Sequence, residues 1–327
     1  MFSSPPPISL KELSSHILRL SDFYIANPAA ETPWREEWCL LAYRYYFLPL
    51  NFIRVQKVIE RGLQRNFFEG LDHFIDWGAG PGTASFALAS NESLAKQIQS
   101  QLLFDISENA INSFSDYQMR LLKNFKTCTK LELQRLSEKK RTCLVFSYSL
   151  TELDDLPAGW KDFEALMIRE PSTGEDGRRL MAWREKITAA GFSLWAPCTH
   201  ELSCPLLTHS KNDWCHDRTA VHLPDWFSEL ENHLPMRNRI VTVSYLLARK
   251  TKPQKLSADT ARVVGDSLGE KGKTRQLICR GTAREYLSWL HKNGEPQVIP
   301  RGELIEVAAN AEVKANEIRM SSHVKVL

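Results

Sequence analysis

The sequence predicts an α/β protein built on a parallel, doubly wound sheet. Between residues 71 and about 196, short apolar runs that suit β-strands alternate with helical patterns, an alternation typical of βαβ units. A glycine-rich turn follows the first of these runs, and acidic or hydroxyl residues follow several others. Ligands of such sheets bind beyond the carboxyl ends of the strands, so we expect the functional site at that edge.

The composition sets limits on the class of protein. The 327 residues suit about two domains, and 43% of them are hydrophobic, as in a globular protein with a large core. With a net charge of +3, any nucleic-acid surface must come from local clustering of basic residues. No apolar run has the length of a membrane span, and residues 1–7 resemble neither a secretory signal nor an Arg-rich presequence. We therefore expect a cytoplasmic protein without membrane association.

Residues 1–66 are predicted to form an N-terminal helical region. Ser9 and Glu12 make a capping box at the start of an apolar helical pattern. Aromatic residues at helical spacing from Trp34 to Tyr45 predict a second helix, whose aromatic face we expect to pack on the main domain rather than to stack on RNA bases. The segment 48–52 contains a proline and predicts a break, and an amphipathic helix with basic residues follows it.

Residues 67–249 are predicted to form the main domain. The expected strands, in chain order, are Leu71–Trp77, Gln101–Phe104, Lys130–Leu136, Cys143–Tyr148, Ala165–Arg169, Phe192–Ala196 and Ile240–Ala248. Helices are expected at 107–123 and 178–190. The seventh strand should pair antiparallel with the sixth. More than forty residues separate these two strands, and a connection of that length in a compact domain is usually functional.

The glycine turn after the first strand predicts a cofactor site. Its spacing is D-x-G-x-G-x-G, made by Asp76, Gly78, Gly80 and Gly82. A dinucleotide fingerprint would need a glycine at position 83, where this chain has threonine, so a nicotinamide oxidoreductase is disfavoured. The spacing instead resembles the first motif of class I S-adenosylmethionine-dependent methyltransferases, whose glycine turn lies under the cofactor. The alternative is a sharp strand-to-helix turn that binds nothing.

Two further strand ends complete the predicted cofactor site. Asp105 follows the second strand, where a carboxylate can accept hydrogen bonds from both ribose hydroxyls of a cofactor. Asp105 could instead cap the following helix, a role that Ser107 can also fill. Ser147 lies at the end of the fourth strand and is included among the cofactor-binding residues.

Cysteines in the long connection predict a metal site. Cys198, Cys204 and Cys215 lie in the insertion 197–222, which also contains four histidines, and Cys279 lies far downstream. Four thiolates suit either zinc or an iron–sulfur cluster. A Cys₃His zinc site that uses His200 or His216 and a set of inert thiols are the alternatives. The remaining cysteines, Cys39, Cys128 and Cys143, lie in apolar settings and are expected to be buried free thiols.

Residues 250–307 are predicted to form a small basic β module. A Gly- and Lys-rich turn contains Lys271 and Lys273, and Arg275 follows on a strand-like segment. We expect these three side chains to contact RNA phosphates, although a solvated loop would have the same composition. Residues 308–327 are polar and are expected to form a loosely held tail.

Several motifs together resemble one family across residues 40–285. They are the turn Asp76–Gly82, the segment Ser147–Leu153, Arg169-Glu170-Pro171, Cys198-x-His200, Cys204-Pro205-Leu206 and Asp213-Trp214-Cys215-His216. The chain resembles the methyltransferase-like small-ribosomal-subunit family, which includes a mitochondrial ribosome assembly factor and bacterial relatives. The resemblance implies S-adenosylmethionine as cofactor, a 4Fe–4S cluster on Cys198, Cys204, Cys215 and Cys279, and binding to small-subunit rRNA.

The resemblance leaves two functions open. One is an rRNA methyltransferase that carries an iron–sulfur cluster; the other is a non-catalytic rRNA-binding assembly factor. The place where amino-directed methyltransferases carry an Asn/Asp-Pro-Pro-aromatic motif reads Ser147-Tyr148-Ser149-Leu150 here, and no catalytic base can be assigned. We expect the chain to be a monomer away from the ribosome.

Overall fold

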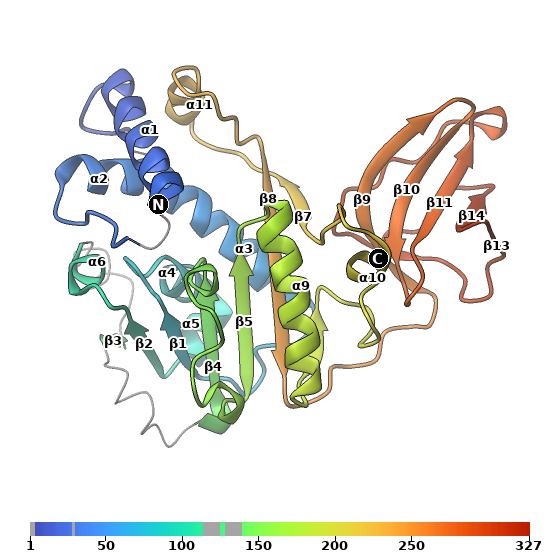
Figure 1. Cartoon of the computed structure of the whole chain (residues 1–327), viewed down its shortest axis with the longest axis horizontal. Helices are drawn as coiled ribbons and strands as arrows, with labels where there is room; N and C mark the ends of the chain where they lie inside the picture. Colours follow the sequence, from blue (N-terminus) through green and yellow to red (C-terminus); the bar gives the residue numbers. More distant parts are fainter. Residues whose placement is uncertain (1–3, 28–29, 114–124, 128–138) are drawn as a thin grey trace. The chain divides into compact units, whose positions relative to one another are not determined.

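The computed structural model describes residues 4–27, 30–113, 125–127 and 139–327, which form two compact units (Figure 1). The first comprises Met1–Glu60, Phe68–Arg169 and Ala220–Val241. The second comprises Arg61–Phe67, Glu170–Thr219 and Thr242–Leu327. Within the described ranges, no helix combines the length and the apolar character that crossing a bilayer requires.

A parallel sheet forms the centre of the first unit. Its strands lie in the order β3-β2-β1-β4-β5, and all four pairings are parallel. The strands are β1 (His73–Trp77), β2 (Ser100–Phe104), β3 (Phe125–Thr127), β4 (Thr142–Ser147) and β5 (Ala165–Glu170). The predicted α/β fold class is therefore confirmed. The expected third strand at 130–136 lies outside the described residues, as does most of the expected helix at 107–123.

Helices precede these strands and alternate with them along the chain. In chain order they are α1 (Leu10–Ala26), α2 (Glu37–Ala42), the π-helix η1 (Tyr43–Phe47), α3 (Leu48–Gln64), α4 (Thr83–Ala89), α5 (Glu92–Gln97), α6 (Glu108–Asn112), the 3₁₀ turns η2 (Lys139–Arg141), η3 (Leu150–Glu152) and η4 (Trp160–Asp162), and α11 (Asp225–Glu231). The Ser9 side chain accepts a hydrogen bond from the Glu12 amide and caps α1, as the sequence predicts. Leu13, Ile17 and Leu20 then form its buried face.

The N-terminal helices pack against the glycine turn. Leu48 of α3 forms a buried cluster with Ala79, Phe86 and Leu103, and Tyr43 packs on this cluster. The break expected at residues 48–52 is absent, because η1 passes directly into α3. Pro49, which has no amide hydrogen to donate, lies at the junction of the π-helix and α3. The helical cap expected from the sequence is thus confirmed, with a π-helix beside the predicted cofactor site.

The second unit contains an antiparallel pair of strands and the residues that surround it. β6 (Ser193–Ala196) pairs antiparallel with β8 (Ile240–Arg249), as expected, and β7 (Asp217–Ala220) also pairs with β8. Helix α9 (Gly174–Ala189) precedes β6, and α10 (Pro205–His209) lies in the predicted cysteine-bearing insertion.

A six-stranded barrel-like sheet completes the second unit. Its strands are β9 (Thr260–Glu270), β10 (Lys273–Cys279), β11 (Glu285–Leu290), β12 (Leu304–Glu306), β13 (Val313–Lys314) and β14 (Glu317–Met320), with the 3₁₀ turn η5 (His291–Asn293) after β11. β9 pairs antiparallel with β10 and β12, β10 pairs with β11, and β11 pairs in parallel with β14. A bridge between Ile305 and Val326 joins β12 to the chain end.

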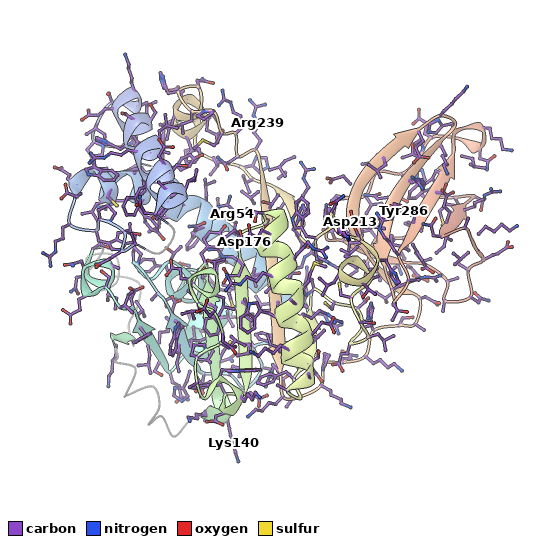
Figure 2. The ribbon with its side chains drawn as sticks, in the orientation of Figure 1. Arg54, Lys140, Asp176, Asp213, Arg239 and Tyr286 are labelled. Carbon is purple, nitrogen blue, oxygen red and sulfur yellow. The ribbon has the colours of Figure 1, made fainter. Side chains whose placement is uncertain are left out.

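Side chains of the insertion and of this barrel meet within the second unit. Arg284, which precedes β11, pairs with Asp213 of the insertion at 2.7 Å. Its guanidinium also lies 5.0 Å from the centre of the Tyr286 ring; Asp213 and Tyr286 are both labelled in Figure 2. A charged contact therefore joins the insertion to the barrel.

The chain end differs from the expectation. Residues 308–327 were expected to form a loosely held tail, but they supply β13, β14 and the closing bridge at Val326. Ile318 and Val324 are buried in the barrel core together with Val263, Leu287 and Trp289. A two-residue strand and a four-residue strand in a polar context are too short for the alternating pattern to be visible in the sequence.

Candidate functional site

The glycine turn places three of the predicted residues at the carboxyl edge of the sheet. β1 lies between β2 and β4, and Trp77 pairs with Phe104 and Phe146. The residues that follow these three positions are Gly78, Asp105 and Ser147, so they lie side by side at the strand ends. The strand register therefore places Asp105 and Ser147 beside the glycine turn.

Position 78 requires a glycine for two independent reasons. Its φ of 66° is left-handed, a conformation that side chains with a Cβ rarely adopt. A Cβ built on Gly78 would also lie 2.5 Å from the Ser149 Cβ. By contrast, a Cβ on Gly80, whose φ is 53°, would meet no atom of the described structure within 4 Å. The turn therefore presses against Ser149 on one side and is open at Gly80.

Asp105 ties the turn to the second strand. Its Oδ2 accepts a hydrogen bond from the Gly80 amide at 2.7 Å, and its Oδ1 accepts one from the Ser107 amide at 2.8 Å. The helix cap that was the alternative role for Asp105 is made by Ser107, whose hydroxyl accepts from the Ala110 amide. Burial raises the pKa of Asp105, although both amides favour its charged form.

Asp76 is buried beneath the turn. Its Oδ2 accepts hydrogen bonds from the Ser85 amide and hydroxyl at 3.2 and 2.9 Å, which fix the start of α4. Its Oδ1 is buried and has no hydrogen-bond partner among the described residues. Burial raises the pKa of Asp76 to about 7. An unsatisfied buried oxygen beside the turn is consistent with a ligand or water that contributes a donor here.

Ser147 contacts an internal arginine. Its hydroxyl accepts hydrogen bonds from Nε and Nη2 of Arg169 at 3.2 and 2.8 Å. Arg169 is only 2% exposed, and its guanidinium lies 3.7 Å from the centre of the Tyr148 ring. Tyr148 has a φ of 65°, an uncommon backbone conformation for a residue other than glycine. The strand end that was expected to offer Ser147 to a cofactor thus holds it against Arg169.

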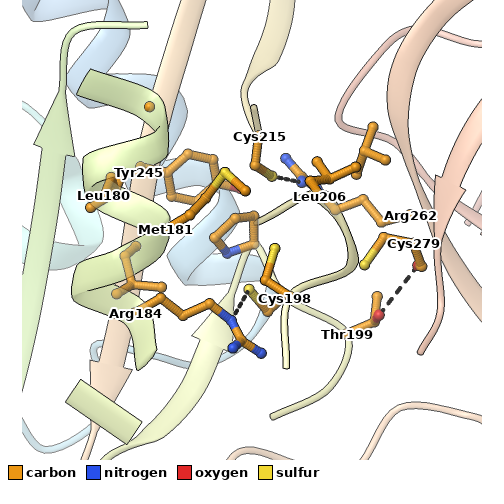
Figure 3. A pocket seen from close by; sticks show the side chains of 15 residues that line it. Leu180, Met181, Arg184, Cys198, Thr199, Leu206, Cys215, Tyr245, Arg262 and Cys279 are labelled. Atoms are coloured by element: carbon orange, nitrogen blue, oxygen red, sulfur yellow. Dashed lines mark hydrogen bonds between the residues drawn. The ribbon is translucent and has the colours of Figure 1, made fainter. Parts of the chain in front are cut away.

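The four predicted metal-binding cysteines line one cavity of the second unit (Figure 3). Cys198 follows β6, Cys204 precedes α10, Cys215 precedes β7, and Cys279 ends β10. Apolar side chains form much of the wall, including Leu180, Met181, Leu206 and Val264. The cavity volume is about 40 Å³, more than one water molecule needs. The structure therefore brings together thiols that are as much as 81 residues apart in the chain.

Polar groups contact three of these thiols. Arg184 donates from Nε to the Cys198 sulfur at 3.3 Å, and Arg262 donates from Nη1 to the Cys215 sulfur at 2.8 Å. The Cys279 sulfur lies 3.4 Å from Nε2 of His200. Burial raises the pKa of Cys204 to about 11 and also raises the pKa of Cys198 and Cys279. These thiols would release protons on binding a metal.

Cysteine sulfur is a common metal donor, but the described side chains around this cavity are not arranged as a metal-ion site. Four sulfurs facing one cavity are the donors that zinc or an iron–sulfur cluster takes. In the described part of the chain, no three His, Cys, Asp or Glu side chains stand together as a ready metal-ion site. Of the other cysteines, Cys39 and Cys143 are buried as expected and form no disulfide in the described structure, and Cys128 lies outside the described residues.

A comparison with protein families matches residues 38–295 to the model described as mitochondrial small ribosomal subunit Rsm22. The chain belongs to the Rsm22 family. No curated protein matches it significantly.

Solved structures give distant likenesses to this Rsm22-family chain. A Pyrococcus horikoshii protein described as an RNA methyltransferase has a TM-score of 0.34 at 13% identity, covering 60% of this chain and 84% of its own. A precorrin-6y C5,15-methyltransferase of Geobacter metallireducens has a TM-score of 0.35 at 11% identity, covering 58% and 88%. A Thiobacillus denitrificans S-adenosylmethionine-dependent methyltransferase solved with S-adenosyl-L-homocysteine has a TM-score of 0.32 at 10% identity, covering 59% and 90%. Likenesses this distant carry no functional inference.

The three basic residues predicted to contact RNA in this Rsm22-family chain differ from one another in their exposure and in their ion pairs. Lys271 is exposed at the β9–β10 turn. Lys273 lies 2.5 Å from Glu317 and 3.6 Å from Glu270, and Arg275 pairs with the same two carboxylates. Ion pairs within the barrel therefore balance two of the three predicted charges.

Sequence reasoning missed several residues of both sites. Arg169, Arg184 and Arg262 are each at most 3% exposed and face Ser147, Cys198 and Cys215. Tyr43, from the π-helix, shares a 3.1 Å hydrogen bond with Thr83 at the start of α4. No local pattern marks these contacts, because each partner lies at least 14 residues away in the chain.

Asp76 gives a testable pH dependence. Its pKa is about 7 in the folded chain against an ordinary value of 3.8, so the folded state holds more protons between these values. The free energy of unfolding should therefore fall, by roughly 4 kcal/mol at most, as pH rises from about 4 to 7. Asp76→Asn keeps an acceptor for Ser85 and should remove this contribution. Urea denaturation of both proteins at several pH values measures it, and identical slopes would contradict the assignment.

Proposed function

We propose that this chain binds S-adenosylmethionine at its glycine turn, holds a 4Fe–4S cluster on its four clustered cysteines, and acts on the rRNA of the small ribosomal subunit. The observation that carries the cofactor proposal is the turn itself, with Asp105 fixing the Gly80 amide at the carboxyl edge of a parallel sheet. The ribosomal proposal rests on membership of a family whose description names the small ribosomal subunit.

The residues at the turn fit S-adenosylmethionine. Gly80 leaves open space where a side chain would stand, and Asp105 keeps lone pairs that can accept from ribose hydroxyls. The unpaired Oδ1 of Asp76 adds a buried acceptor, in the part of the chain that the structure describes. When bound, S-adenosylmethionine supplies an electrophilic methyl group. Calorimetry of the intact protein with S-adenosylmethionine tests the proposal, and no heat of binding at millimolar cofactor would exclude it.

The cavity of the second unit fits an iron–sulfur cluster. Four thiols face one space with apolar walls, and such clusters take cysteine sulfurs as ligands and depend on restricted water access. Zinc held by four cysteines, or by three with His200, is the alternative, since His200 lies beside Cys279. Iron, acid-labile sulfide and zinc content of protein purified without oxygen decides between them. About four irons and four sulfides per chain are expected.

A second candidate function is a non-catalytic assembly factor that uses the same fold to bind rRNA. The contacts of Arg169 favour this function. Arg169 donates a hydrogen bond to Ser147 and stacks on Tyr148, at the end of β4 where a methyltransferase would bind its target base. Incubation of small-subunit rRNA with the chain and methyl-labelled S-adenosylmethionine separates the two. Label in the rRNA supports the enzyme, whereas rRNA binding without label supports the assembly factor.

RNA binding should depend on Lys271 more than on Lys273. Lys271→Gln removes an exposed charge and is expected to weaken rRNA binding, with the slope of log affinity against log salt reduced by about 1. Lys273→Gln removes a charge that Glu270 and Glu317 already balance, so a smaller change is expected. Filter binding at several salt concentrations measures both slopes. Equal losses for the two variants would contradict the role given to Lys271.

A further inference from the structure

Two buried arginines contact the cysteine cavity from separate elements of the second unit. Arg184 lies on α9 and Arg262 on β9, and each side chain is 3% exposed. Each donates a hydrogen bond to the sulfur of a different cysteine, Cys198 and Cys215, as the dashed lines in Figure 3 mark. A buried guanidinium is costly unless it is paired. Each of these arginines is paired with a carboxylate, Glu185 or Asp217, and contacts a thiol in addition.

Arg184 holds the segment between two of the cysteines. Besides its bond to Cys198, its Nη2 donates to the carbonyls of His200 and Leu202 at 2.9 and 2.7 Å. Its Nη1 donates to Glu185, whose Oε1 accepts from the Cys204 amide at 3.2 Å. Arg184 therefore fixes both the sulfur of Cys198 and the loop that leads to Cys204.

Arg262 belongs to a chain of charges that reaches a less buried part of the unit. Its Nη2 donates to Asp217, which lies 3.5 Å from Nε of Arg61. Arg61 in turn pairs with Glu303 at 2.7 Å. Among the described residues, Arg184 is therefore paired with Glu185, Arg262 with Asp217, and Arg61 with Asp217 and Glu303.

We infer that Arg184 and Arg262 are positioning residues that stabilise the negatively charged cluster and set its reduction potential. This inference rests on the proposed function, because it needs the cluster in the cavity. Four thiolates give a 4Fe–4S group a net negative charge, and one added electron makes that charge larger. A buried cation hydrogen-bonded to a ligand sulfur stabilises the reduced form more than the oxidised form. Both arginines therefore raise the potential and retain the metal.

Arg178 supplies a matched control. It lies on the same helix as Arg184 and donates to the carbonyls of Leu206, Leu207 and Asp213, so it also holds the insertion. It has no bond to a cysteine sulfur among the described contacts. A purely structural arginine should thus behave like Arg178.

The test compares wild type, Arg184→Gln, Arg262→Gln and Arg178→Gln, all purified without oxygen. Redox titration followed by electron paramagnetic resonance gives the potential, and exposure to an iron chelator gives cluster retention. We expect lower potentials and about 10–100-fold weaker metal retention in the first two variants, and an unchanged potential in Arg178→Gln. Arg184→Lys should recover part of the shift, because it keeps the charge.

Arg262→Gln leaves Asp217 buried with Arg61, 3.5 Å away, as its cation partner, and the loss of the closer pair lowers the stability of this variant. The double variant Arg262→Gln/Asp217→Asn removes the pair together, and a smaller downward shift is expected in it because a negative charge is removed as well. Potentials of the Arg184 and Arg262 variants equal to that of Arg178→Gln would overturn the inference while leaving the cluster in place. A wild-type protein with zinc or without metal would overturn the proposed cluster, and this inference with it.

Discussion

Gly78→Ala is expected to abolish S-adenosylmethionine binding and to leave the rest of the fold intact. The substitution adds a Cβ at a φ of 66°, where an L side chain is strained, and places it 2.5 Å from the Ser149 Cβ. Either Ser149 or the turn must move. The Gly78 amide donates to the Phe104 carbonyl at 2.8 Å, and the Gly80 amide donates to Asp105. Movement of the turn therefore disturbs Asp105 as well.

The expected cost in stability is modest compared with the loss of binding. A left-handed alanine costs about 1–2 kcal/mol, and the close contact adds to it. Most domains tolerate a loss of about that size. Calorimetry with S-adenosylmethionine measures binding, and thermal unfolding measures stability. We expect no binding at cofactor concentrations up to about 1 mM.

Gly159→Ala is the matched control for this prediction. Gly159 has a φ of 82° and precedes η4 in the same unit, and a Cβ there would lie 3.7 Å from Asp162, an ordinary contact. It should lose a similar amount of stability and keep full cofactor affinity. If both glycine variants bind S-adenosylmethionine as wild type does, the turn is a strand-to-helix connection and the cofactor site must be sought elsewhere.

Local patterns in the sequence were sufficient to predict the centre of the first unit. The strand before Gly78, the turn and the alanine-rich helix α4 follow one another in the chain, so spacing and residue type predict them together. The same holds for the α1 cap at Ser9, which depends on two residues three positions apart. The order of the strands then places Asp105 and Ser147 beside the turn.

Local sequence patterns could not predict contacts between residues that lie far apart in the chain. The sequence predicts that Ser147 binds the cofactor because it lies at the end of a recognisable strand. Arg169, which donates a hydrogen bond to the Ser147 hydroxyl, comes from another strand and could not be identified from local spacing. Nothing in the sequence distinguishes Arg184 and Arg262 from other basic residues. Their hydrogen bonds to the sulfurs of Cys198 and Cys215 depend on the fold. The chain end was misjudged for a related reason, since β14 gains its stability from the barrel rather than from its own sequence.

Cys279→Ser is expected to release the cluster and to loosen the barrel from the insertion. Cys279 ends β10, while Cys198, Cys204 and Cys215 all come from the insertion 197–222. A cluster bound to all four would link the insertion, which ends at residue 222, to a residue 57 positions later, and the loss of the cluster removes the stabilisation that its binding gives. Iron content should fall from about four per chain to near zero.

The same variant should lower the midpoint of thermal unfolding, because the thiol is replaced by a weak ligand at a partly buried position. Cys39→Ala is the control: Cys39 is fully buried on α2 and does not line the cavity, so the iron content should stay unchanged while the packing loss lowers the midpoint slightly. Measuring iron, sulfide and unfolding on the same samples links the two effects. Full iron in Cys279→Ser would remove this residue from the ligand set, and His200, which lies 3.4 Å from its sulfur, would then be the next ligand to replace.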